Sequence, residues 1–227
     1  MKSFHELSSH LPAEVGIAIA AVGSSPIFLG TLSSGVAWST SKVPLAVAAL
    51  RVGVGSRQLV TQTIAQSDNA AAEELWSQLG DPASAARQVQ DVIREAGDPA
   101  TVVESRRLRE GYTAFGQTRW SLADQARFAA GLAQVADASA VVDLMRGLTT
   151  DHRWGLAAKG FAAKGGWGPG LADDYLVRQL GLVPTASGTL GVALAAEIHD
   201  GEHEAGVDVV NSLADWLVDR LADLTQE

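Results

Sequence analysis

Apolar residues follow two different periods along the chain, and the period changes twice. Residues 14–22 and 26–38 are apolar runs joined by the turn-like Gly-Ser-Ser at 23–25, a pattern typical of two strands. From about residue 39 the apolar positions recur every three or four residues, which predicts helices. After about residue 153, apolar runs separated by Gly and Pro return and predict three more strands, followed by an amphipathic final helix.

The helical middle of the chain carries the residues that usually begin and end helices. Ser-Asp-Asn at 67–69 and Asp81 before Pro82 are typical starts, and Gly80 and Gly97 are typical stops. Residues 98–119 have no clear period and are predicted to form a long loop. The predicted helices are residues 3–10, 39–52, 54–66, 67–80, 81–97, 121–136, 138–148 and 204–224, and the predicted strands are residues 14–22, 26–38, 153–167, 173–184 and 188–199.

This order of elements predicts an α+β fold in two lobes. Strands from both ends of the chain would form one sheet, and the helices between them would form a second body. We expect residues 1–38 and 150–227 to form the sheet lobe. Residues 39–149 would form the helical lobe, including the loop at about 98–119.

The net charge and the cysteine count exclude some kinds of binding partner and some kinds of chemistry. The formal net charge of the 227-residue chain is −9 at pH 7, which argues against nucleic acids and anionic membrane surfaces. There is no cysteine, so disulfides, thiolate catalysis and thiolate metal sites are excluded. The apolar run at 15–22 is too short to span a bilayer, and the first residues do not resemble a signal peptide. The sequence therefore indicates a cytoplasmic protein, or an extracytoplasmic one if a leader peptide was removed. It does not indicate the oligomeric state.

A serine and a lysine stand at the start of an apolar helix. Ser39 and Lys42 are three residues apart and would share a helix face. A serine hydroxyl becomes a nucleophile only when a base takes its proton, and a lysine can be that base when burial and a helix N-terminus lower its pKa. A capping serine beside a solvated lysine would give the same local pattern, so these two residues alone leave both interpretations open.

Two further motifs favour the catalytic interpretation. Ser67-Asp68-Asn69 precedes a predicted helix, and Lys164-Gly165-Gly166 lies in a predicted strand. The motifs S-x-x-K, S-D-N and K-T-G, in this order, are typical of class A β-lactamases and penicillin-binding proteins. The chain therefore resembles the serine β-lactamase and penicillin-binding family over nearly its whole length, most closely the small class A-like members. That resemblance implies a β-lactamase-like fold, an antiparallel sheet flanked by helices, with a reduced helical lobe.

The resemblance also implies a role for each matching residue. Ser39 would attack an acyl carbonyl and form an acyl-enzyme, and Lys42 would take or relay its proton. Ser67 would pass the proton towards the leaving nitrogen. Asn69 would orient Lys42 and the substrate amide, and Lys164 would keep the site positive. The implied substrate is a small-molecule or peptide acyl compound, and no cofactor is expected.

The substrate contacts follow from the same resemblance. The backbone N–H groups of Ser39 and Trp167 would form the oxyanion hole, where each such donor stabilises developing charge by about 3 kcal/mol. Gly165, Gly166 and Arg178 would bind substrate, Arg178 near the position of the family's carboxylate-binding arginine. Trp38 and Trp167 flank the two motifs and are the tryptophans expected nearest a ligand.

Three departures from the family pattern qualify these roles. Gly165 stands where the family has Thr or Ser, so the hydroxyl that binds the substrate carboxylate is missing. The predicted loop lacks Glu-x-x-Leu-Asn; Glu104 and Glu110 are its carboxylates, and neither is in the motif. Without a placed base for water, an acyl-enzyme would be long-lived. Ser39 and Ser67 are only 28 residues apart, which indicates a trimmed helical lobe.

Two alternatives remain. A non-catalytic binding protein could have kept the same fold, and a Ser39 hydroxyl within ~3 Å of the Lys42 amine would argue against it. The second alternative is a metal site in the polar stretch at 199–204, which contains His199, Asp200, Glu202, His203 and Glu204. Gly201 argues against a shared helix for the two histidines, so a polar turn is preferred and no metal is expected.

Overall fold

A five-stranded antiparallel sheet forms the centre of the molecule. The computed structural model describes residues 3–170, 174–199 and 201–221. The strand order in the sheet is β2-β1-β7-β6-β5, so β5 lies at one edge. The strands are β1 (Glu14–Ala20), β2 (Ile27–Gly30), β5 (Ala162–Pro169), β6 (Asp174–Thr185) and β7 (Gly188–His199). The predicted α+β fold, with strands from both chain ends in one antiparallel sheet, is confirmed.

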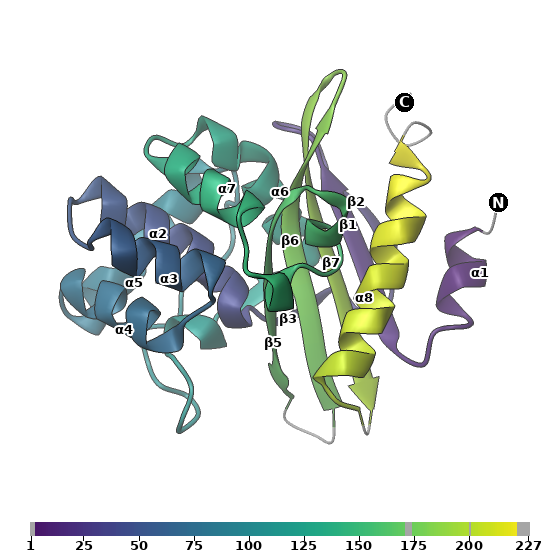
Figure 1. The fold of residues 1–227 in the computed structure, drawn as a ribbon, viewed down its shortest axis with the longest axis horizontal. Coiled ribbons are helices and arrows are strands. Elements are labelled where there is room, and N and C mark those ends of the chain that lie inside the picture. Colours follow the sequence, from purple (N-terminus) through teal and green to yellow (C-terminus); the bar gives the residue numbers. More distant parts are fainter. Residues whose placement is uncertain (1–2, 171–173, 200, 222–227) are drawn as a thin grey trace.

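Helices cover both faces of this sheet. Successive β7 residues point to opposite faces: Val192 and Leu194 pack with α8 (His203–Val218), and Ala193 and Ala195 pack with α6 (Leu122–Gly131). The second interface is especially close, because a Cβ on Gly191 would lie 2.0 Å from the Ala126 carbonyl oxygen. In Figure 1, α8 lies across the front of the sheet.

The remaining long helices form a block beside the sheet, on the left of Figure 1. They are α2 (Lys42–Arg51), α3 (Arg57–Ala65), α4 (Asn69–Gln78), α5 (Pro82–Glu95) and α7 (Ala138–Arg146). Side-chain caps begin several of them, and Asp68 and Asp81 accept the N-terminal N–H groups of α4 and α5. The core of the block continues onto β5 and β6 of the sheet, and fully burying a side chain such as Leu75 or Ile93 in it contributes about 1.5–3 kcal/mol.

Glycines with positive φ break two of the predicted strands. The run at 26–38 is interrupted at Gly30, whose φ is 104°, and β3 (Ser34–Val36) pairs separately with β4 (Arg119–Ser121). The run at 153–167 becomes a strand only at β5, after Gly160 with φ 82°. The predicted helix at 39–52 is a 3-10 turn, η1 (Trp38–Ser41), followed by α2. The other short elements are α1 (Phe4–Ser8), η2 (Phe115–Gln117), η3 (Leu132–Gln134), η4 (Thr150–His152) and η5 (Ala157–Lys159).

The predicted lobe boundaries stay a prediction. α6 falls in the segment assigned to the helical lobe, yet it packs on the sheet against β1 and β7. Within residues 3–170, 174–199 and 201–221, no single helix is long and apolar enough to cross a membrane. The pair Leu122–Gln134 and Ala138–Arg146 meets that test only when taken together and is bent by 112°.

Candidate active site

The first two sequence motifs meet through the Lys42 side chain. Lys42 is the first residue of α2 and is 1% exposed. Its Nζ donates to the Ser67 carbonyl oxygen at 2.5 Å and to Asn69 Oδ1 at 2.7 Å. Ser67 Oγ lies 3.4 Å from the same nitrogen. The predicted convergence of Lys42, Ser67 and Asn69 is therefore present in the structure.

The third motif reaches the same serine from the sheet. Lys164 on β5 is 1% exposed, and its Nζ donates to Ser67 Oγ at 2.7 Å and to the Gly165 carbonyl oxygen at 2.9 Å. Ser67 has a left-handed φ of 54°, a conformation that costs about 1–3 kcal/mol outside glycine. The bonds from the two lysines hold the residue in that conformation, so the Ser67 hydroxyl lies between two amino groups.

Burial makes both lysines easier to deprotonate. Loss of solvation lowers the pKa of Lys42 from 10.5 to about 7, although the negative charge of Asp68 opposes the shift. Burial, and secondarily the charge of Lys42, lowers the pKa of Lys164 well below its usual value. Near neutral pH a large fraction of Lys42 is therefore an uncharged amine, which can accept a proton.

Ser39 lies in η1 and lines the same cavity as Lys42. The structure describes both side chains and shows no hydrogen bond between them, so the expected contact of ~3 Å is not formed. The Lys42 amine is instead directed to Ser67 and Asn69. Ser39 itself is half-buried.

β5 approaches the backbone of Ser39 at Gly166. A Cβ on Gly166 would lie 2.8 Å from the Ser39 backbone nitrogen and 2.8 Å from the Ala37 carbonyl oxygen. Only glycine permits this approach, and it brings the next residue, Trp167, to the cavity that Ser39 also lines. The two residues predicted to form the oxyanion hole are thus placed on adjacent segments.

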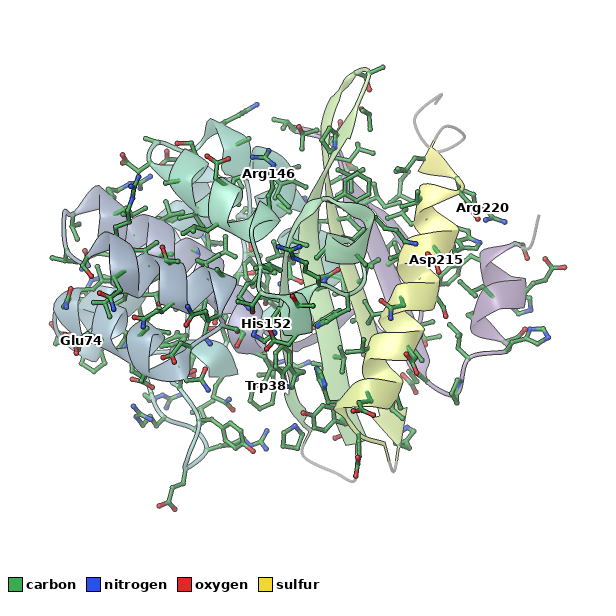
Figure 2. All side chains as sticks on the ribbon, viewed as in Figure 1. Trp38, Glu74, Arg146, His152, Asp215 and Arg220 are labelled. Carbon is green, nitrogen blue, oxygen red and sulfur yellow. The ribbon has the colours of Figure 1, made fainter. Side chains whose placement is uncertain are left out.

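The cavity beside these residues has a volume of about 320 Å³. It lies where the helical block meets the sheet, and Trp38, which is labelled in Figure 2, is one of its lining residues. It is lined by Trp38, Ser39, Lys42, Asn69, Gly111, Tyr112, Thr113, Trp167, Gly168, Pro169 and Tyr175.

A family model described as the beta-lactamase enzyme family matches residues 52–221 of the chain. The chain belongs to the beta-lactamase enzyme family. The match includes Ser67, Asn69 and Lys164 and begins after Ser39 and Lys42. A search of curated proteins gave no match.

Solved structures of this family have the same fold. A beta-lactamase from Chitinophaga pinensis is 15% identical, with a TM-score of 0.71 over 95% of this chain and 97% of the other. One from Burkholderia vietnamiensis is 18% identical, with a TM-score of 0.71 over 97% and 95%. One from Xanthomonas campestris pv. campestris is 19% identical, with a TM-score of 0.68 over 96% of each chain. The TM-scores establish a beta-lactamase fold for this chain, and at identities this low the comparison shows the fold alone.

Within this family fold, Gly165 has a structural reason to lack a side chain. A Cβ at this position would lie 2.3 Å from the ring of Trp154. Trp154 is 6% exposed and packs in the core under α8. The space that a threonine at position 165 would need is therefore filled by an indole ring, and Gly165 does not line the cavity among the described residues.

The structure does not bring Arg178 to the cavity, contrary to its predicted role in substrate binding. Arg178 is 0% exposed on β6, and its guanidinium donates to carbonyl oxygens of Gly35, Val36 and Trp120 and to Gln125 Oε1. The cause is its position on an inner strand, facing the β3–β4 pair. Arg178 holds the segment that precedes Ser39 and has no access to a ligand.

The long loop at 98–119 supplies residues that the sequence did not single out. Tyr112 and Thr113 line the cavity, and Arg109 Nη1 donates to the Pro169 carbonyl oxygen at 2.8 Å at the end of β5. The loop has no period from which their direction could be read. The two carboxylates considered from the sequence lie elsewhere: Glu104 pairs with Arg106 and Glu110 is exposed.

The polar stretch at 199–204 forms no metal site in the described part of the chain, where no group of three or more His, Cys, Asp or Glu side chains could hold an ion. Asp200 lies outside the described residues. The ring of His203 packs on Trp167, with centroids 4.6 Å apart. His152 also contacts Trp167, at 5.5 Å, and its Nε2 bonds the Gln66 carbonyl oxygen at 2.9 Å.

Proposed function

We propose that this protein is a serine acyl-transferase or hydrolase of the β-lactamase and DD-peptidase type, in which Ser39 forms an acyl-enzyme. The observation that carries this proposal is the convergence of two buried lysines on the Ser67 hydroxyl, beside a cavity lined by Ser39. Membership of the beta-lactamase enzyme family supports hydrolase chemistry in general.

The proposed reaction begins when uncharged Lys42 takes the Ser39 proton as Ser39 Oγ attacks the acyl carbonyl carbon. The oxyanion that forms would be held by the backbone N–H groups of Ser39 and Trp167. The bond from carbon to the leaving group then breaks. The leaving group takes a proton from the Ser67 hydroxyl, and Lys42 replaces that proton across the 3.4 Å that separates Nζ from Ser67 Oγ.

The hydrogen bonds around Ser67 favour this route. Lys164 Nζ donates to Ser67 Oγ at 2.7 Å, and this bond would stabilise the oxygen while it gives up its proton. Asn69 Oδ1 accepts from Lys42 at 2.7 Å and fixes the direction of the amine. We further propose that deacylation is slow, since no carboxylate lines the described part of the cavity to activate water.

The second candidate is a catalytically degenerate binding protein with a beta-lactamase fold. It is favoured by the missing hydrogen bond between Ser39 and Lys42 and by the glycine at 165. Such a protein would bind a ligand in the same cavity without forming a covalent bond.

Intact-mass measurement separates the two candidates. After incubation with a reporter penicillin and, separately, an activated ester, the wild-type chain is expected to gain one acyl group from at least one reagent. Ser39→Ala removes only the hydroxyl and should gain none. No adduct from either reagent, or equal labelling of Ser39→Ala, would reject the acyl-enzyme.

The pH dependence of acylation tests the role of Lys42. The uncharged amine dominates above the pKa of Lys42, about 7, so the acylation rate should rise with pH through that region and then level off. Asp68 raises this pKa through its negative charge. In Asp68→Asn the midpoint of the profile should therefore move to lower pH, while asparagine still caps α4.

A matched variant distinguishes charge from capping. Asp81→Asn changes the equivalent cap of α5, and Asp81 is not among the groups that shift the pKa of Lys42. Its acylation profile should keep the wild-type midpoint. A midpoint in Asp68→Asn that is unchanged or higher would show that another group controls the rate.

A further inference from the structure

Aromatic rings form one part of the cavity wall, beside polar residues such as Ser39, Asn69 and Thr113. Four rings line it, and Pro169 adds a fifth apolar surface; the rings belong to Trp38, Tyr112, Trp167 and Tyr175. Among the described lining residues, Lys42 is the one ionisable amine, and no acidic side chain lines the cavity. A flat apolar group can therefore stack on a ring in this cavity.

Two of these rings are fixed by their neighbours. Trp38 is 7% exposed, with a left-handed φ of 50°, and its ring lies so close to β5 that a Cβ on Gly168 would be 2.5 Å from it. The Tyr112 ring meets it edge to face, with centroids 5.1 Å apart. Aromatic pairs of this geometry are favourable beyond the area they bury, so this wall is preformed.

Arg109 supports the wall from outside the cavity. Its guanidinium lies 4.6 Å from the Tyr112 ring and 5.5 Å from the Trp38 ring, and Nη1 donates to the Pro169 carbonyl oxygen at 2.8 Å. These contacts tie the loop at 98–119 to the end of β5. Arg109 is not among the residues that line the cavity.

The other cations near the site are already used within the protein. Lys164 is fully buried and bonded to Ser67 Oγ and the Gly165 carbonyl oxygen. Arg178 is fully buried and bonded to interior carbonyl oxygens. The Lys42 amine lines the cavity, but it is bonded to the Ser67 carbonyl oxygen and Asn69 Oδ1, and above pH 7 it is mostly uncharged. A ligand carboxylate placed in this cavity would therefore lose water without gaining a permanently charged partner among the described lining residues, which is unfavourable.

We propose that this cleft takes uncharged acyl donors with an aromatic acyl group, and rejects donors with a carboxylate beside the scissile bond. The proposal rests on the acyl transfer to Ser39 proposed above. For a thioester donor, the bond between Ser39 Oγ and the acyl carbon forms, the carbon–sulfur bond breaks, and the departing thiol carries away the proton that Ser39 loses.

A matched pair of thioesters tests the charge preference. Both carry a phenylacetylglycyl acyl group; one has thioglycolate as its leaving group and the other has the neutral methyl ester of thioglycolate. The rate of thiol release gives the acylation rate for each donor. It is measured at about pH 7.5, where most of Lys42 is uncharged because its pKa is about 7. Each rate is divided by the rate of hydroxide-catalysed hydrolysis of the same donor, because the thiol of the methyl ester is intrinsically the better leaving group. On this corrected scale the neutral donor is expected to react at least about 10-fold faster. Equal rates, or a faster carboxylate donor, would overturn the proposed charge preference.

The aromatic preference has its own comparison. Replacing phenylacetyl by acetyl in the neutral donor should lower the acylation rate about 10-fold, because the contacts with Trp38 and Tyr112 are lost. If the acetyl donor reacts as fast, the aromatic part of the proposal is wrong. Adducts on Ser39 with any of these donors keep the acyl-enzyme proposal intact, whereas no adduct from any donor would reject both.

A cation placed in the cavity should reverse the charge preference. Tyr175 on β6 lines the cavity, and Tyr175→Arg would offer a guanidinium to the thioglycolate carboxylate. The carboxylate donor should then become the faster of the pair, while Tyr175→Gln, which has no charge, should keep the wild-type order. The same order in both variants would show that charge in this cavity does not select the donor.

Discussion

Replacing Lys42 by methionine is expected to lower the rate of Ser39 acylation by about 10²–10⁴-fold, the usual contribution of a positioned general base. Methionine fills a similar volume but accepts no proton. Lys164 cannot take over this function easily, because its amine is held by Ser67 Oγ and the Gly165 carbonyl oxygen. The rate is measured as adduct formation in single-turnover mass spectrometry.

The stability of the same variant shows whether the loss is chemical. A buried lysine whose pKa falls from 10.5 to about 7 is protonated less readily when folded, so at pH 7 its burial costs about 3–5 kcal/mol of unfolding free energy. That cost is full below pH 7 and disappears as pH rises towards 10.5. Lys42→Met removes this cost, but it also removes the hydrogen bonds to Ser67 and Asn69, which offsets part of the gain in stability.

Lys42→Met should therefore melt no lower than the wild type at pH 7, and its advantage should shrink as the pH rises. Lys159→Met is the matched control, because Lys159 pairs with Asp215 near the surface, away from the cavity. It should acylate at the wild-type rate. Wild-type acylation by Lys42→Met would instead mean that a different base activates Ser39.

Local sequence rules predicted the elements of this fold better than the contacts between them. Asp68 and Asp81 begin helices as their types predict, because a cap acts within a few residues. The split at Gly30 and the pairing of Ser34–Val36 with Arg119–Ser121 depend on segments far apart in the chain. No local pattern contains that pairing.

The residues of the candidate site also fall into two groups, those that the sequence could predict and those that it could not. Ser67, Asn69 and Lys164 could be grouped from the order of short motifs, since a resemblance carries their arrangement with it. Tyr112 and Arg109 could not, because their loop has no period that fixes the direction of a side chain. The alternation of β6 predicts that Arg178 shares a face with Leu176 and Leu180, but not that the β3–β4 pair covers that face.

The burial of Arg178 leads to the second large effect. Arg178→Met would leave the Val36 carbonyl oxygen and Gln125 Oε1 without a donor. The carbonyl oxygens of Gly35 and Trp120 would lose one donor and keep their pairing in the β3–β4 ladder. Each buried acceptor left unpaired costs about 1–3 kcal/mol. Burial also lowers the pKa of Arg178 to about 9, so removing the cation recovers some solvation energy. The expected net loss in unfolding free energy is about 2–4 kcal/mol.

The same bonds connect Arg178 to the nucleophile. Gln125, which accepts from Arg178 at 2.8 Å, donates through Nε2 to Thr40 Oγ1 at 2.9 Å, and Thr40 follows Ser39 in η1.

Arg178→Lys should recover little of the lost stability, because a lysine cannot reproduce the forked set of donors. Arg119→Met, on the exposed side of β4, should change the unfolding free energy by less than about 0.5 kcal/mol. Chemical denaturation measures all three, and an Arg178→Met chain as stable as Arg119→Met would show that these interior bonds contribute little to folding.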